Sequence, residues 1–248
     1  MSGLISIVGA GPGDPELLTV KALKSIQEAD YLLHDALVSK EILDLARPDV
    51  QRIYVGKVYH DGQDQTERQD WINQLLIELV SKGFKVCRLK SGDPMIFGRG
   101  AEEIRFCIEN NLKYEVIPGV TSALAAASLH GIPLTERGKN SMVLFGTGSY
   151  CDGDFCDLDS FVSVLKSGSP IIFFMGLNKL VHLATRLMES SISPETPVQI
   201  LSKVSQPESS VLEGKLGSIA KQLEKQKPPM PALVIIGKNA ERLSGEKL

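Results

Sequence analysis

The sequence has few aromatic residues, few cysteines and no long apolar stretch. Aromatic residues make up 6% of the 248 residues, with one tryptophan, and there are four cysteines. No apolar run approaches the ~20 residues that a membrane-spanning helix needs. The N-terminal segment, residues 1–14, has no basic stretch before its apolar part, which is typical of a buried strand and not of a secretory signal. We therefore expect the protein to be cytoplasmic.

The sequence also lacks an excess of charge of either sign. It has 27 basic and 30 acidic residues, which gives a formal net charge of −3 at pH 7. A protein that binds nucleic acid over its whole surface would be basic, so this class is disfavoured. A local basic pocket is still compatible with this balance of charges. With 43% hydrophobic and 23% charged residues, the composition is that of a globular protein.

Cysteine and histidine do not have the spacing of a metal site. Cys87 and Cys107 lie in apolar segments, so we expect them to be buried. Cys151 and Cys156 are close together in an acidic loop, but no second pair lies nearby, so a disulfide or a metal site is not expected there. The histidines are scattered along the chain. No metal site is therefore predicted.

Apolar, β-branched runs alternate with helical patterns through the first half of the chain. The expected strands are residues 4–11, 29–35, 51–57, 85–93 and 114–119. The expected helices are residues 19–29, 40–46, 66–83 and 100–111. This alternation is typical of an open, mostly parallel α/β sheet.

The second half begins with an alanine-rich helical pattern, residues 120–131. Further strands are expected at residues 141–148, 170–176, 197–204 and 232–238, and further helices at 177–190 and 216–226. The best internal boundary is Pro118–Gly119. The sequence thus predicts the α/β class, with an N-terminal α/β domain of residues 1–118 and a C-terminal α/β domain of residues 119–248.

Glycine-rich and polar residues follow the first four expected strands. The first strand ends in the GAGPGD segment, residues 9–14, and the fourth in SGDP, residues 91–94. The second ends in Asp35 and the third in Gly56 and Lys57. Open α/β sheets bind ligands at this edge, so the pattern predicts a binding crevice. Asp35 and Lys57 are candidates for proton transfer, although exposure to solvent without a function is the more usual fate of such residues.

The GAGPGD segment does not fit a dinucleotide-binding fingerprint. Its sixth residue is Asp14, where the fingerprint has glycine or alanine, and a carboxylate there would repel a pyrophosphate. Pro12 removes a backbone donor from the turn. Two interpretations stay open: a tight turn without a ligand, or a rigid turn that brings the backbone close to an uncharged or cationic ligand.

The segment GDPMIFGRGAEE, which follows the fourth strand, is more distinctive. Asp93 is suited to accept hydrogen bonds from a ribose or a charged amine. Arg99 is either a surface cation or an anion clamp. Glu102 and Glu103 lie in the first turn of the next helix, where we interpret them as favouring the helix dipole.

The chain resembles the tetrapyrrole methylase family nearly from end to end, from Ile7 to about Gly237. The segments that carry the resemblance are residues 8–23, 32–39, 54–57, 88–103, 116–138 and 173–180. Within the family, the GDPxIFGRGxEE form of residues 92–103 is specific to the members that act on the first tetrapyrrole substrate. The resemblance implies two α/β domains with the active site in the cleft between them, and a homodimer.

The resemblance also implies a methyltransferase that uses S-adenosyl-L-methionine and releases S-adenosyl-L-homocysteine. The positions that match the family's cofactor site are Pro12, Ser91, Gly92, Asp93, Ile96, Thr121, Ser122, Met175, Val204 and Ala232. Val204 and Ser91 depart from the family, which often has a smaller residue at each position. Without the resemblance, Met175 would be assigned to the core. Asp35 and Lys57 match the family's proposed proton-handling pair, and are our catalytic candidates.

The implied reaction is C-methylation of uroporphyrinogen III at C-2 and C-7, which gives precorrin-2 by way of precorrin-1 for sirohaem or cobalamin synthesis. Because this tetrapyrrole is a polycarboxylate, its pocket needs cations. The substrate-binding candidates are Arg99, Arg137 and Lys139, with Lys57 as a further cation. The alternatives are methylation of a later corrinoid precursor or of ribosomal RNA, a nucleotide-dependent dehydrogenase, and a non-catalytic module that binds S-adenosylmethionine.

Overall fold

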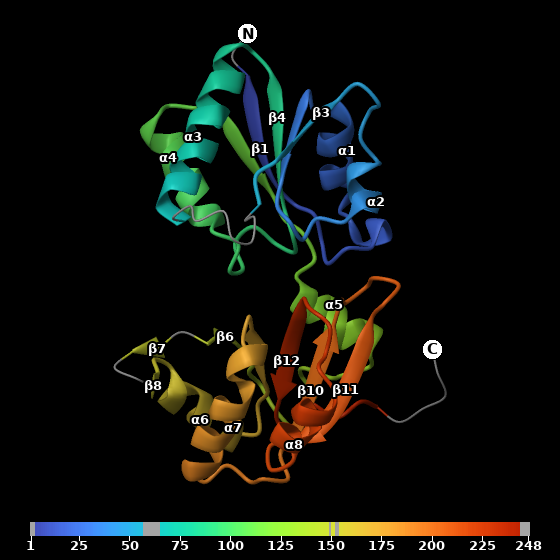
Figure 1. Cartoon of the computed structure of the whole chain (residues 1–248), viewed down its shortest axis with the longest axis vertical. Coiled ribbons are helices and arrows are strands. Elements are labelled where there is room, and N and C mark those ends of the chain that lie inside the picture. The colour runs from blue at the N-terminus through green and yellow to red at the C-terminus, as the bar shows by residue number, and fades with distance from the viewer. Residues whose placement is uncertain (1–2, 57–64, 149, 152–153, 244–248) are drawn as a thin grey trace. The chain divides into compact units, whose positions relative to one another are not determined.

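The computed structural model describes residues 3–56, 65–148, 150–151 and 154–243, and the chain divides into two compact units. These units are Met1–Ser122 and Ala123–Leu248. Each contains a five-stranded sheet with helices packed against it (Figure 1). The α/β class expected from the sequence is confirmed, and the domain boundary at residues 118 and 119 stays a prediction. In the described part of the chain, no helix is both long enough and apolar enough to cross a membrane.

The first unit is built on a parallel sheet with the strand order β3-β2-β4-β1-β5. The strands are β1 (Leu4–Gly9), β2 (Tyr31–His34), β3 (Gln51–Tyr54), β4 (Lys85–Lys90) and β5 (Tyr114–Ile117). Every neighbouring pair in this sheet is parallel. Their carboxyl ends therefore meet at one edge of the sheet, as the sequence pattern predicts.

Helices cover both faces of this sheet (Figure 1). One face carries α1 (Val20–Glu28) and α2 (Lys40–Leu43), and the other carries α3 (Gln65–Ser81) and α4 (Gly100–Glu109). The short 3-10 helix η1 (Pro15–Leu17) precedes α1. Successive side chains of β1 alternate between the two faces: Ile7 packs with the α3 side and Val8 with the α1 side. A strand buried on both faces tends to be apolar along its length, which explains why β1 can be predicted from the sequence.

Side chains cap the first two helices. Thr19 Oγ1 accepts a hydrogen bond of 3.1 Å from the N–H of Ala22, and Ser39 Oγ accepts one of 3.4 Å from Ile42. Each cap satisfies a backbone donor that has no partner within the helix. Ser39 also donates a hydrogen bond of 2.7 Å to the carbonyl oxygen of Gly13. The start of α2 is thereby fixed to the loop that follows β1.

The second unit has a mixed sheet with the strand order β11-β10-β12-β9-β6. The strands are β6 (Leu144–Thr147), β9 (Ile171–Phe174), β10 (Pro197–Ser202), β11 (Ser210–Lys215) and β12 (Ala232–Ile236). Only β6 and β9 are parallel among these pairs, whereas β12 is antiparallel to β9 and β10 is antiparallel to both of its neighbours. A separate two-stranded ribbon is formed by β7 (Tyr150–Cys151) and β8 (Asp154–Phe155).

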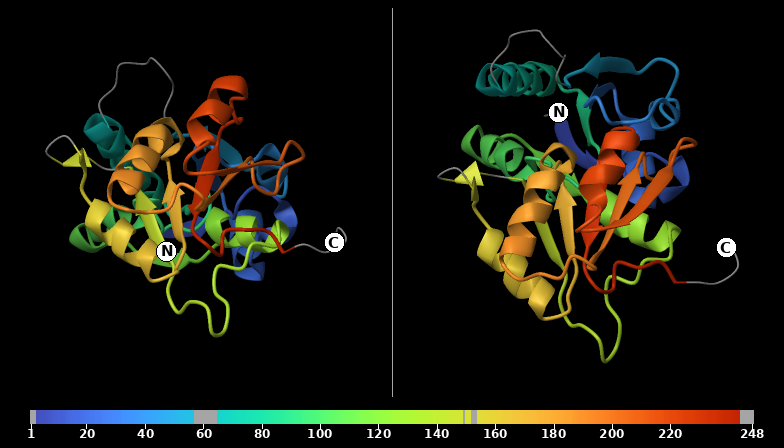
Figure 2. Two further views of the ribbon diagram at one scale, coloured as in Figure 1. Left: turned by 90° about the horizontal axis from the view of Figure 1, so that it is seen from below. Right: turned by 60° about the horizontal axis from the view of Figure 1, so that its bottom comes forward.

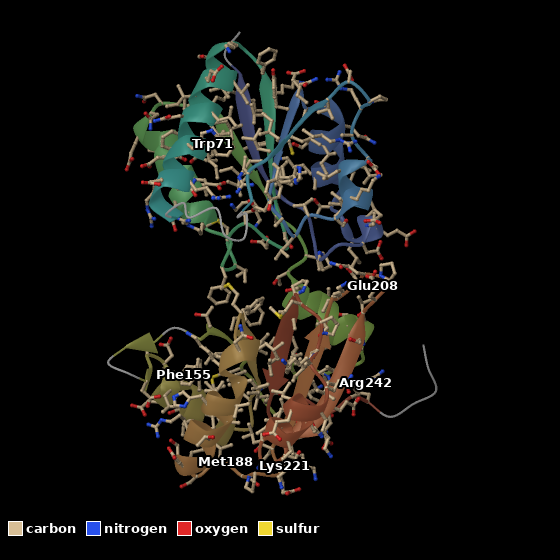
Figure 3. All side chains as sticks on the ribbon, in the orientation of Figure 1. Trp71, Phe155, Met188, Glu208, Lys221 and Arg242 are labelled. Carbon is tan, nitrogen blue, oxygen red and sulfur yellow. The ribbon has the colours of Figure 1, made fainter. Side chains whose placement is uncertain are left out.

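Helices also lie on both faces of the second sheet (Figure 2). One face carries α6 (Leu158–Lys166), α7 (Leu180–Glu189) and α8 (Ile219–Lys225), and the other carries α5 (Ser122–Leu129). The 3-10 helix η2 (Leu177–Lys179) leads into α7. The rings of Phe161 and Phe173 meet edge to face in the core between α6 and β9, with centroids 6.0 Å apart. Side chains pack against both sheets throughout the two units (Figure 3).

The cysteines differ in part from the sequence-based expectation. Cys87 and Cys107 are free and buried, as predicted. Cys156 is disulfide-bonded, so the expectation that it forms no disulfide is wrong. That expectation came from the absence of a second cysteine pair nearby, and a single disulfide does not need one.

Candidate functional site

Three loops meet at the carboxyl edge of the parallel sheet, those that follow β1, β4 and β5. Gly92 and Gly11 exchange backbone hydrogen bonds: Gly92 N–H donates to Gly11 O at 2.7 Å, and Gly11 N–H donates to Gly92 O at 3.1 Å. Gly119 packs directly on Gly92, because a Cβ at position 119 would lie 2.2 Å from Gly92 O. Only glycine permits so close an approach of two backbones. The loops that the sequence assigns to a binding crevice thus form one assembly.

Asp93 connects two of these loops through its carboxylate. Its Oδ1 accepts a hydrogen bond of 2.8 Å from Met95 N, and its Oδ2 accepts one of 3.0 Å from Gly119 N. A carboxylate has about four lone-pair sites, so both oxygens keep capacity to accept a further hydrogen bond. The expected role of Asp93 in binding a ribose or an amine stays a prediction.

The cofactor candidates of the first unit lie together in these loops. They are Pro12, Ser91, Gly92, Asp93, Ile96, Thr121 and Ser122. Pro12 is buried between two glycines that both have positive φ. The side of Gly92 that carries no side chain faces Thr121 Cα at 3.8 Å and Ser122 N at 3.9 Å, measured from an added Cβ. The structure therefore brings the segment after β5 against the glycine of the β4 loop.

The cofactor candidates of the second unit lie on neighbouring strands of its sheet. Met175 follows β9, Val204 follows β10, and Ala232 begins β12. The end of β10 is tied to the start of β12, because Lys203 N–H donates to the carbonyl oxygen of Pro231 at 2.8 Å. Met175 is 67% exposed, so the assignment to the core that its residue type suggests is wrong.

Non-glycine residues with left-handed backbone gather at the carboxyl ends of strands in both units. They are Phe97, Arg99, Met175, Lys203 and Ser205, with φ between 47° and 63°. Two others, Asn111 and Ser191, lie just after helices. Left-handed backbone costs about 1–2 kcal/mol for a residue with a side chain, and such strain collects at ligand-binding sites. Two of the five flank the cofactor candidate Val204.

The catalytic candidate Asp35 follows β2 and belongs to a charge network with Arg88, Lys90 and Glu103. Arg88 Nη2 donates a hydrogen bond of 2.6 Å to Asp35 Oδ1, and Arg88 Nε donates one of 3.2 Å to Glu103 Oε1. Lys90 Nζ donates to the same Glu103 oxygen at 2.8 Å and lies 3.9 Å from Asp35 Oδ2. The side chains of Arg88, Lys90 and Glu103 are at most 5% exposed, whereas that of Asp35 is 30% exposed.

The network balances two cations against two carboxylates. Burial lowers the pKa of Lys90 below its usual range and the neighbouring Arg88 cation lowers it further, while Glu103 and Asp35 act in the opposite direction. Removing a charge from water costs several kcal/mol per ion, so each buried member needs its partners. Asp35 is the member that solvent and a substrate can reach.

The sequence-based interpretation missed three members of this network. Glu103 lies in the first turn of α4, as the interpretation in terms of the helix dipole requires, but its buried carboxylate also binds two cations, which that interpretation does not include. Arg88 and Lys90 occupy alternate positions of an otherwise apolar strand, so they share one face of β4. The sequence signal that could have revealed this network is the presence of two basic residues on one face of a buried strand.

The substrate-binding candidates lie in exposed loops. Arg99 Nη2 donates to Glu102 Oε2 at 2.6 Å, and Lys139 Nζ lies 2.9 Å from Glu136 Oε2. Arg137 is exposed to solvent. Lys57, a candidate for both catalysis and binding, lies outside the described residues. The roles of all four stay predictions.

Comparison with known proteins identifies relatives along the whole chain. Residues 4–220 match the family model for tetrapyrrole (corrin/porphyrin) methylases. The chain is 46% identical over 235 residues to a siroheme synthase of Psychrobacter arcticus and 43% identical over 236 residues to that of Hahella chejuensis. Each alignment covers 95% of this chain but only 42% and 49% of those proteins, respectively. The chain thus spans about half the length of the curated relatives it matches.

Two solved structures match over nearly the full length of both chains. The native form of uroporphyrin III C-methyl transferase from Thermus thermophilus has a TM-score of 0.81 and 34% identity, covering 99% of this chain and 97% of that one. A complex of the Thermus enzyme with S-adenyl homocysteine has a TM-score of 0.79 and 36% identity, covering 95% and 98%. The family model and these structures agree with the resemblance that the sequence motifs indicate. The chain therefore belongs to the tetrapyrrole (corrin/porphyrin) methylase family.

Proposed function

We propose that this chain catalyses the S-adenosylmethionine-dependent C-methylation of uroporphyrinogen III at C-2 and C-7, giving precorrin-2 by way of precorrin-1. The observation that carries the proposal is the identity of 34–36%, over nearly the whole of both chains, to the uroporphyrin-III C-methyltransferase of Thermus thermophilus. The similarity to siroheme synthases supports a tetrapyrrole substrate. The product would serve sirohaem or cobalamin synthesis.

The loops at the carboxyl edge of the first sheet fit a cofactor of this kind. Gly92 carries no side chain, so the segment of Thr121 and Ser122 lies close to its backbone, and it is held in place by Gly11. Asp93 offers acceptors to hydroxyl or amine groups, and Thr121 and Ser122 supply hydroxyls beside Gly92. When bound, S-adenosylmethionine supplies an electrophilic methyl group. In this proposal Met175, Val204 and Ala232 complete the cofactor site.

Asp35 removes the proton that methylation makes acidic. A pyrrole carbon that accepts a methyl group places positive charge on the ring system, and a proton must then leave. The Asp35 carboxylate is partly exposed and is oriented by Arg88, which are the properties of a general base. General base catalysis by a positioned group contributes about 10²–10⁴-fold to the rate. Lys57 is the second member of the proposed proton-handling pair.

Cations of the exposed loops bind the carboxylates of the substrate. The guanidinium groups of Arg99 and Arg137 suit carboxylates because they donate two parallel hydrogen bonds. Arg99 is held by Glu102, so binding requires it to exchange one carboxylate partner for another. Lys139 adds a third positive charge. The homodimer that the resemblance implies is part of the same proposal.

The test is anaerobic incubation of the purified protein with uroporphyrinogen III and S-adenosylmethionine, followed by mass spectrometry of the tetrapyrrole. The expected product carries two added methyl groups, and a control without S-adenosylmethionine carries none. An unmodified tetrapyrrole, obtained with a protein that still binds the cofactor, would contradict the proposal and favour a later corrinoid precursor as substrate.

A further inference from the structure

Glu103 holds both cations of the charge network through one oxygen atom. Its Oε1 accepts hydrogen bonds from Arg88 Nε at 3.2 Å and Lys90 Nζ at 2.8 Å. Its Oε2 is buried and has no hydrogen-bond partner among the described residues. A buried polar atom without a partner is destabilising, and buried ion pairs seldom stabilise a fold more than apolar residues of the same size. Stability therefore does not account for the network.

The geometry points to a role of the network at Asp35, its partly exposed member. We propose that Glu103 is a positioning residue, which sets the orientation and the charge state of the Asp35 carboxylate through Arg88 and Lys90. Glu103 is 1% exposed, so it acts on the reaction only through these neighbours. The inference rests on the proposed function in one respect, the use of Asp35 as the base.

Arg88 fixes the orientation of the Asp35 carboxylate, because each of its nitrogen atoms has a different hydrogen-bond acceptor. Nε is held by Glu103 and Nη1 donates to the carbonyl oxygen of Leu89 at 3.1 Å. The guanidinium is planar and rigid, so these two bonds fix the direction in which Nη2 reaches Asp35 Oδ1. Lys90 approaches the other carboxylate oxygen of Asp35. Asp35 Oδ1 is therefore held by a directed hydrogen bond, and Oδ2 by the longer ion pair with Lys90.

Charge state follows from the balance of the network. Among the described residues, His34 on β2 also interacts with Asp35, and Arg52 on β3 acts in turn on His34. Burial lowers the pKa of His34, which favours its neutral form at pH 7, and Arg52 is paired with Asp44 at 3.0 Å. Without Glu103, both buried cations would act on Asp35 alone. The carboxylate would then be a weaker base.

The test measures the titration of Asp35 directly, by ¹³C NMR of carboxyl-labelled aspartate, with Asp35→Asn used to assign the resonance. Glu103→Gln preserves the size of the side chain and removes its charge. We expect Asp35 to titrate at lower pH in this variant, because the two cations are no longer balanced. Glu109→Gln, an exposed change on the same helix, is the matched control and should leave the titration unchanged. A folded Glu103→Gln protein with an unshifted Asp35 would overturn the proposal.

Lys90→Met supplies a second test, which decides the matter if Glu103→Gln does not fold. Removal of this cation should move the titration of Asp35 to higher pH, and the double variant should restore it toward the original value. The same shift in single and double variants would contradict the proposal. These readouts need no substrate. If the variants show these shifts but the wild-type protein does not methylate uroporphyrinogen III, the proposed function is refuted and the positioning role stays intact.

Discussion

The carboxylate of Asp93 fixes the backbone of Gly119, a residue 26 positions later in the chain, through a hydrogen bond of 3.0 Å from Gly119 N–H to Asp93 Oδ2. The other carboxylate oxygen accepts from Met95 N in the loop of Asp93 itself. One side chain therefore holds together two of the loops that form the proposed cofactor site.

Replacement of Asp93 tests this arrangement. Asp93→Ala removes both acceptors, and hydrogen bonds to a charged group contribute about 1.5–3 kcal/mol each. We expect the affinity for S-adenosylmethionine, measured by calorimetry, to fall by at least tenfold, which corresponds to about 1.4 kcal/mol. Asp93→Asn keeps one acceptor oxygen and should lose less. An unchanged affinity in Asp93→Ala would exclude this loop from the cofactor site.

The close contact of Gly119 with Gly92 predicts a large loss of stability when a methyl group is added. In Gly119→Ala the new Cβ would lie 2.2 Å from Gly92 O, so the loops must move apart. We expect the free energy of unfolding in urea to fall by more than about 3 kcal/mol. Gly131→Ala is the control, because Gly131 has φ +64° and no described heavy atom within 4 Å of an added Cβ. This variant should lose only ~1–2 kcal/mol, which is the cost of placing a side chain on left-handed backbone. Equal losses in the two variants would be evidence against the loop assembly.

The sequence predicts the first unit better than the second, for a physical reason. The strand β1 is buried on both faces and is almost entirely apolar, and the loops after β1 and β4 carry glycine and aspartate that have no structural use in a strand. The edge strand β11 is partly exposed, so its residues lack an apolar run and the strand was missed. Helix α6 was also missed, although Leu158, Phe161 and Leu165 have helical spacing.

The candidate site could likewise be predicted only in part. Gly92 and Asp93 can be predicted from the sequence because they belong to one short loop motif. The ion pairs of Arg88 with Asp35 and Glu103 join residues that are 53 and 15 positions apart. Such pairs depend on the strand order and register, which the sequence pattern leaves open.

The buried thiol of Cys87 predicts a loss of stability at high pH. Burial raises the pKa of Cys87 from 9.0 to about 12. Between these values the unfolded chain releases the proton and the folded chain retains it, so stability is complete below pH 9 and declines above it. From pH 8 to pH 10.5 we expect wild type to lose about 2 kcal/mol more than Cys87→Ala in urea unfolding. Parallel losses in the two proteins would show that the thiol ionises normally in the fold.

The measurement that tests the account most directly compares wild type with Asp35→Asn in the anaerobic methylation of uroporphyrinogen III. Wild type should add two methyl groups. Asp35→Asn keeps the shape of the side chain without a basic carboxylate, so its rate should fall by about 10²–10⁴-fold while it still binds S-adenosylmethionine. Equal rates of methylation in the two proteins would contradict the assignment of Asp35 as the base, and an unmethylated tetrapyrrole with wild type would contradict the proposed function itself.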